Sequence, residues 1–132
     1  MEARSLLRLA RMPPAPVDGT VLDQLHSALG GDTALLQRVI DNYLDGMDGR
    51  LEALRRAVER EPKNLERAAH ALASPSATLG VRCIAEPCMA IERAVEAGRP
   101  PRDLIAQLLG KVEAAVEPAR TALRSWLERR AA

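Results

Sequence analysis

Aromatic side chains are nearly absent from this chain of 132 residues, which has no Phe, one Trp and one Tyr. A core without them has to be built from Leu, Val, Ile and Ala, as in a bundle of helices. The same shortage removes the platforms on which single-stranded nucleic acids stack. Basic and acidic side chains nearly cancel, leaving a net charge of +1. We therefore expect no nucleic acid partner, because such partners favour a concentrated basic face.

Long apolar runs and clustered cysteines are also missing. No stretch of about 18 apolar residues predicts a membrane span, and the N-terminus has neither an apolar signal core nor a clear cleavage site. Cys83 and Cys88 are separated by five positions on a predicted helix, where they point to different sides and cannot form a disulfide. No set of Cys and His ligands clusters around them. These absences predict a cytoplasmic protein with two reduced thiols and no bound metal.

Helical periodicity is the dominant pattern that is present. Four long amphipathic segments with short connections follow one short helix that Asp18 caps and Gly30-Gly31 end. The fold class they predict is all-α, an antiparallel up-and-down four-helix bundle with one or two short N-terminal helices. Prolines within three of the long helices predict bends. The long helices are expected over residues 32–61, 62–80, 81–98 and from about 101 onward, with bends at Pro75, Pro87 and Pro118.

The first 16 residues form a separate N-terminal extension, and residues 17–132 the bundle. Leucines at positions 6, 7 and 9 predict a short helix over residues 1–11. The proline-rich stretch Met12–Pro16 cannot continue it and predicts a stiff connector. Such a segment either joins this domain to a larger protein or packs on the bundle as an arm.

A histidine stands on the outer face of the helix expected over Pro62–Gly80. At about 100° per residue, His70 lies roughly 140° from Leu65 and about 160° from Leu72. A histidine that serves packing would sit on the leucine side of the helix. The spacing therefore predicts an exposed imidazole. The predicted inward stripe comprises Leu65, Ala69, Leu72, Ser76 and Leu79.

The same stretch, AHALASPSATLG, resembles the signature of the histidine-containing phosphotransfer (HPt) family. That signature has a His, a Leu two residues on, a Ser four residues on, and later a hydrophobic residue followed by Gly. The positions that match are His70, Leu72, Ser74 and Leu79-Gly80. Where the family has a basic residue and a second serine, this chain has Ala73 and Pro75.

The following helix strengthens the resemblance, since Ile84, Cys88 and Ile91-Glu92 are similar to a family helix that often carries a Cys and then Leu-Glu. The resemblance spans residues 17–95, and the remainder is compatible with the family's closing helix. It implies a phosphoryl carrier in a His-Asp phosphorelay, with His70 as the phosphoacceptor. The partners would be a response-regulator receiver domain, a hybrid histidine kinase, or both.

To carry a phosphoryl group, the chain itself needs to supply only an accessible imidazole. A neutral imidazole is a competent nucleophile near pH 7. The metal and the acceptor carboxylate can come from the partner, so no cofactor is expected here and Mg²⁺ is expected in the receiver. We expect a monomer, because the bundle is self-contained. The expected partner-binding residues are Lys63, Glu66, Arg67, Ala73, Ser74, Ala77 and Arg82.

The alanine at position 73 removes a cation that would attract phosphoryl oxygens and the acidic pocket of a receiver. Ala73, Ser74 and Ala77 are small neighbours of His70 and would let a partner approach the imidazole closely. Arg67, one turn before His70, is the candidate that partly replaces the missing charge, with Lys63 and Arg82 further away.

Autonomous enzyme activity is not predicted. The chain has no glycine-rich phosphate loop, no HExxH and no nucleophile elbow. Besides a working carrier, two alternatives remain open. One is a degenerate HPt-like module that binds and regulates a receiver or kinase without carrying phosphate, and the other is a helical adaptor whose exposed histidine is accidental.

Overall fold

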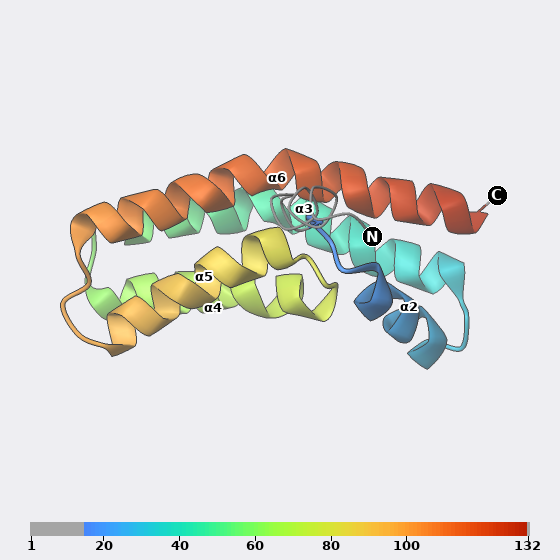
Figure 1. Cartoon of the computed structure of the whole chain (residues 1–132), viewed down its shortest axis with the longest axis horizontal. Coiled ribbons are helices and arrows are strands. Elements are labelled where there is room, and N and C mark those ends of the chain that lie inside the picture. Colours follow the sequence, from blue (N-terminus) through green and yellow to red (C-terminus); the bar gives the residue numbers. More distant parts are fainter. Residues whose placement is uncertain (1–14, 132) are drawn as a thin grey trace, which may run out of the picture.

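The computed structural model describes residues 15–131, and throughout this range the secondary structure is helical. The five helices are α2 (Gly19–Ala28), α3 (Thr33–Ala57), α4 (Pro62–Thr78), α5 (Arg82–Glu96) and α6 (Arg102–Ala131). Figure 1 shows the four long helices side by side as an antiparallel bundle, with α2 beside the end where α3 begins. The predicted fold class is confirmed. The helix predicted over residues 1–11 and most of the connector after it lie outside the described residues.

The ends of the helices follow from local signals. Asp18 and Asp32 cap α2 and α3, each carboxylate accepting a hydrogen bond at 3.0 Å from a backbone N–H. We predicted that α3 would run to about residue 61, but it ends at Ala57. Pro62 explains why the helix does not reach residue 61, because a residue before proline avoids the helical region and Glu61 is extended, with ψ 147°.

The internal prolines do not interrupt the helices. α4 continues through Pro75, α5 through Pro87 and α6 through Pro118. Figure 1 shows α6 bent near its middle.

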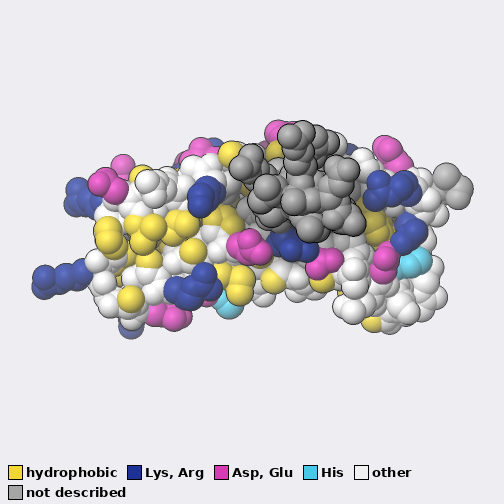
Figure 2. All heavy atoms as spheres, viewed as in Figure 1, with side chains coloured by type: hydrophobic (Ala, Val, Ile, Leu, Met, Phe, Trp, Pro, Cys, Tyr) yellow, Lys and Arg dark blue, Asp and Glu magenta, His cyan; other side chains and the backbone are white. Residues whose placement is uncertain are grey.

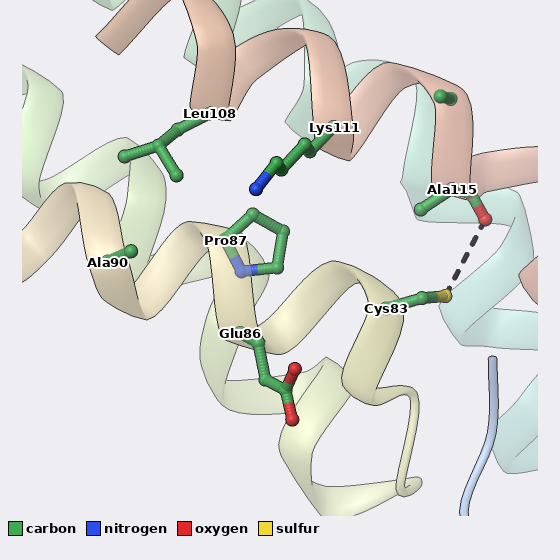
Figure 3. Close-up of a pocket in the computed structure, with 8 residues that line it drawn as sticks. Cys83, Glu86, Pro87, Ala90, Leu108, Lys111 and Ala115 are labelled. Atoms are coloured by element: carbon green, nitrogen blue, oxygen red, sulfur yellow. Dashed lines mark hydrogen bonds between the residues drawn. The ribbon is translucent and has the colours of Figure 1, made fainter. Parts of the chain in front are cut away.

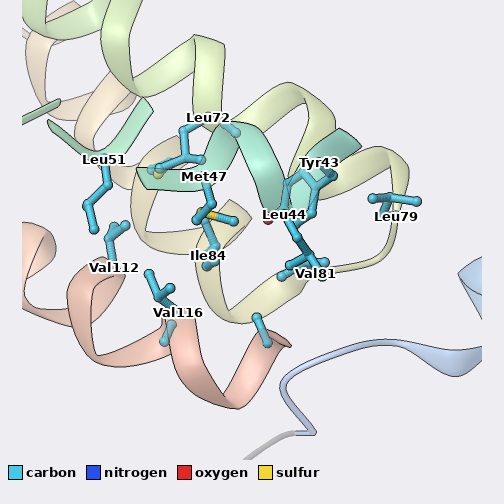
Figure 4. Close-up of a cluster of buried hydrophobic side chains, with 14 of the residues drawn as sticks. Tyr43, Leu44, Met47, Leu51, Leu72, Leu79, Val81, Ile84, Val112 and Val116 are labelled. Atoms are coloured by element: carbon cyan, nitrogen blue, oxygen red, sulfur yellow. The ribbon is translucent and has the colours of Figure 1, made fainter. Parts of the chain in front are cut away.

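Aliphatic side chains from all four long helices meet in one core (Figure 4). Its largest fully buried members include Met47, Leu72, Ile84 and Val112, one from each long helix. The buried stripe of α4 is the predicted one: Leu65, Ala69, Leu72, Ser76 and Leu79 are all buried.

One polar pair is buried within this core. The Tyr43 hydroxyl lies 2.7 Å from Ser76 Oγ, and Ser76 Oγ donates to the Leu72 carbonyl at 2.7 Å. Because that donation uses the serine proton, the tyrosine hydroxyl is the donor between them. Burial raises the pKa of Tyr43, so its hydroxyl stays neutral. The pair joins α3 to α4, the helix that carries His70.

The segment before α2 is attached to the turn between α4 and α5. Asp18 N–H donates to the Gly80 carbonyl at 2.8 Å, and the Pro16 carbonyl accepts from Cys83 N–H at 3.2 Å. At the other end of α2, His26 lies 3.0 Å from Thr33 Oγ1 and edge-on to Trp126. Both ends of α2 are therefore held on the bundle. Within residues 15–131, no helix combines the length and apolar character that a membrane span needs.

Candidate functional site

His70 lies on the outer face of α4, as its spacing predicted. Its side chain is 69% exposed. The opposite face of α4 packs into the core, where Ala69 and Leu72 are both fully buried. The imidazole is thus carried by a helix that cannot turn without disturbing the core.

The side chain that contacts His70 comes from α5. Glu92 Oε2 lies 3.4 Å from His70 Nδ1 with hydrogen-bond geometry, and Oε1 lies 3.3 Å away without it. The glutamate is only 19% exposed, and its Oε1 is buried without a hydrogen-bond partner. A carboxylate can only accept hydrogen bonds, so this contact favours the tautomer with the proton on Nδ1. Nε2 is then left with its lone pair available to a partner.

Side chains from α4 and α5 form a shallow hollow around the imidazole. Its volume is about 490 Å³, and its only basic lining residue is Arg67. Two predicted partner-binding residues, Glu66 and Arg67, are thus brought together with His70. Sequence reasoning did not include Glu92 or Glu96 in the site. The lining residues are Glu66, Arg67, His70, Ala71, Glu92 and Glu96.

The other predicted partner-binding residues have different positions. Lys63, Ser74 and Ala77 are exposed on α4, before and after His70. Arg82, at the start of α5, lies 3.3 Å from Asp18 Oδ2. Its guanidinium is therefore engaged with the N-terminal cap of α2.

The prediction that Ala73 is open to a partner is wrong. This residue is 3% exposed and belongs to the core cluster. It stands at the edge of the inward stripe of α4, where close packing of the neighbouring helices covers it. Its small size therefore serves helix packing rather than direct access for a partner.

The described residues give little support to metal binding or to thiol chemistry. Between positions 15 and 131, no group of three or more His, Cys, Asp and Glu side chains could hold a metal ion. Both cysteines are free thiols. Burial raises the pKa of Cys88 to about 12, with Glu92 adding to the shift. That thiol is therefore protonated and unreactive at neutral pH.

The chain is similar to a known protein family. A family model described as Hpt domain matches residues 38–129. The match covers α4 with His70, α5 with Glu92, most of α3 and nearly all of α6. No curated protein matches the chain closely enough to count as a relative.

Proposed function

The chain belongs to the Hpt domain family, and from that premise we propose that it accepts and donates a phosphoryl group through His70. Membership implies histidine phosphotransfer in two-component signalling, as a carrier rather than an autonomous enzyme. The finer proposal is a His-Asp phosphorelay, in which the partner is a response-regulator receiver domain, a hybrid histidine kinase, or both. The observation that carries it is an imidazole that is 69% exposed, stands on a helix packed into the core, and has one nitrogen turned to a carboxylate.

The transfer step follows from that geometry. The Nε2 lone pair attacks the phosphorus of an aspartyl phosphate on the receiver, forming an N–P bond. The P–O bond to the aspartate breaks, and its electron pair stays on the aspartate carboxylate. Because the imidazole proton is on Nδ1, no proton has to leave Nε2. The ring becomes cationic, and the Glu92 carboxylate beside Nδ1–H stabilises it.

The partner supplies what this chain lacks. A Mg²⁺ ion, expected in the receiver, would neutralise charge on the transferring phosphoryl group. The hollow around His70 carries three carboxylates and one guanidinium, Arg67. We propose that Arg67 takes part of the role that a basic residue at position 73 would have, with Lys63 further along α4.

Replacing Glu92 tests the role of its carboxylate. Glu92→Ala should slow transfer to His70 by about two- to tenfold, or ~0.4–1.4 kcal/mol, because the Nδ1 contact is lost. Removing a negative charge should by itself help an anionic phosphoryl group approach, so slower transfer would indicate orientation of the ring. Glu96→Ala is the matched control, since Glu96 lines the same hollow but makes no hydrogen bond or ion pair with His70. Equal rates in the two variants would contradict the positioning role.

Replacing Arg67 tests the proposed cation. Arg67→Ala should slow transfer from a phosphorylated receiver by roughly two- to fivefold, the range expected for an exposed charge pair. Higher salt should reduce the difference, because exposed charges are screened. Arg124→Ala, a change on the exposed surface of α6, is the control and should have no effect. An unchanged rate for Arg67→Ala would contradict the proposal that Arg67 replaces the missing cation.

The carrier proposal is tested by offering the chain phosphorylated receivers and a hybrid kinase. Label that moves to the chain, is lost in acid and survives alkali would identify a phosphohistidine. Receiver binding without any label would favour the alternative, a regulatory module that carries no phosphate, for which the missing cation at Ala73 is the argument. Neither binding nor label would leave a plain helical adaptor.

We also propose that the protein is cytoplasmic and monomeric. Two free thiols are typical of a reducing compartment such as the cytoplasm. A monomer is expected, because the four helices already share one core. Light scattering at several concentrations would measure the mass directly.

A further inference from the structure

Basic and acidic side chains are interspersed over the face of the molecule in Figure 2. The hollow between α5 and α6 gives an example (Figure 3), since Lys111 is the one basic residue among the described residues that line it. Like most basic residues between positions 15 and 131, Lys111 is exposed. Arg50 of α3 is an exception.

Arg50 has a guanidinium nitrogen that is buried and unused. The residue is half-buried, and its Nη1 has no hydrogen-bond partner in the described part of the chain. No ion pair joins Arg50 to a described carboxylate. Withdrawing a charged donor from water without an acceptor is costly, and most buried polar atoms have a partner. The unused donor therefore points to an anionic group that binds here.

The guanidinium lies on Gly46, one turn earlier on the same helix. A β-carbon at Gly46 would lie 2.7 Å from Arg50 Nη1 and 3.1 Å from Cζ. Only a glycine leaves room for this close approach. Burial raises the pKa of Tyr43, and the positive charge of Arg50 acts against that rise. Both observations place the charge over residues 43–46 of α3.

This part of α3 faces the part of α4 just after His70. The hydrogen bond between Tyr43 and Ser76 sets which turns of the two helices lie opposite each other. Because α3 and α4 are antiparallel (Figure 1), moving three residues forward on α3 corresponds to moving three residues back on α4. Gly46 is therefore opposite Ala73, which is buried.

Ala73 is close to the phosphoacceptor. It lies about 4.5 Å along the helix axis from His70 and about 60° round the helix, on the side that packs against α3. Glu92 approaches His70 from α5 instead. α4 packs against both helices, whereas α3 and α5 share little contact. The Arg50 guanidinium and the Glu92 carboxylate thus lie on different sides of the helix that carries His70.

We propose that Arg50 binds the phosphoryl group carried by His70, an inference that rests on the proposed function. From its place on Gly46, the guanidinium donates to a phosphoryl oxygen, an acceptor whose charge and geometry suit arginine. Because the donor is partly withdrawn from water, this hydrogen bond is stronger than one from a solvated cation. Arg67 lines the hollow beside Glu92, so the two arginines approach the phosphoryl group from different sides.

The test measures how fast the chain takes label from phosphoramidate, a small donor that needs no receiver. Arg50→Gln should slow acceptance about tenfold, because a charge-assisted hydrogen bond to the phosphoryl group is lost. Arg38→Gln changes an exposed arginine on the same helix and should leave the rate unchanged. The Arg50 side-chain N–H signal in NMR spectra, assigned by its loss in Arg50→Gln, should shift when His70 is phosphorylated. A purely structural role would not move that signal.

Gly46→Ala moves the guanidinium without removing its charge. The added β-carbon overlaps Nη1, so the flexible arginine side chain gives way and acceptance should show part of the same loss. Gly49→Ala is the matched control, because a β-carbon there meets no atom within 4 Å. Equal rates in these two variants would overturn the proposal that Arg50 acts from its place on Gly46.

The remaining outcomes separate this inference from the carrier function. If Arg50→Gln takes label as fast as the unchanged chain, the inference is overturned and the carrier function stands. If the variant is slow only with a phosphorylated receiver, the inference is also overturned, and Arg50 contacts the receiver instead of the phosphoryl group. An unchanged chain that takes no label from either donor would overturn both.

Discussion

His70→Gln is expected to abolish phosphoryl acceptance, reducing label on the chain to background. Glutamine keeps a polar side chain but has no ring nitrogen with a lone pair that can form an N–P bond. The bundle should be unaffected, because the imidazole is 69% exposed and only its contact with Glu92 is a hydrogen bond to another described residue. Circular dichroism and the melting temperature should match those of the unchanged chain, so the loss is one of chemistry.

The matched control is the other histidine. His26 is half-buried, with Thr33 Oγ1 at 3.0 Å and Trp126 edge-on to the ring. His26→Gln should therefore lower stability by about 0.5–1.5 kcal/mol through lost contacts, while label is accepted as before. Equal labelling of the His70→Gln chain would show that another residue is the acceptor.

Gly80→Ala is expected to be the most destabilising of the single substitutions considered. Gly80 has φ +70°, and a β-carbon there would lie 2.8 Å from Val21 Cβ and 2.9 Å from the Asp18 carbonyl oxygen. The left-handed conformation alone costs a residue with a side chain about 1–2 kcal/mol, and the overlap with α2 adds to it. We expect a loss of about 2–4 kcal/mol in the free energy of unfolding, measured by urea denaturation.

Gly110 provides the matched control for that substitution. It lies within α6, is exposed, and a β-carbon there would meet no atom within 4 Å. Gly110→Ala should raise the free energy of unfolding by about 0.5–1 kcal/mol, because alanine is the better helix former. If both alanines behaved alike, the close packing of α2 on the α4–α5 turn would not be a determinant of stability.

The fold was largely readable from the sequence because its signals are local. Aspartate caps, proline starts and apolar stripes repeat at helical spacing, and each acts within one or two turns. The end of α3 was placed too late because the periodicity of Leu54 and Val58 continues up to Pro62. The proline restricts Glu61 to an extended conformation, a local effect that the apolar pattern concealed.

The site was readable only in part. Exposure of His70 follows from its angle on one helix, far from the buried stripe. Ala73 stands at the edge of that stripe, where burial depends on how closely the next helix packs, and the prediction that it is open to a partner was wrong. The Glu92 contact joins residues on different helices. Helical spacing cannot give the register between two helices, although the resemblance had already drawn attention to Glu92.

The central claim is that His70 accepts the phosphoryl group on the nitrogen turned away from Glu92. The most direct measurement is nitrogen-15 and phosphorus-31 NMR of the chain after transfer from a phosphorylated receiver. The account predicts coupling of phosphorus to Nε2 of His70, a protonated Nδ1, and an unchanged His26 imidazole. Phosphorus on Nδ1, on His26 or on a side chain other than histidine would contradict it.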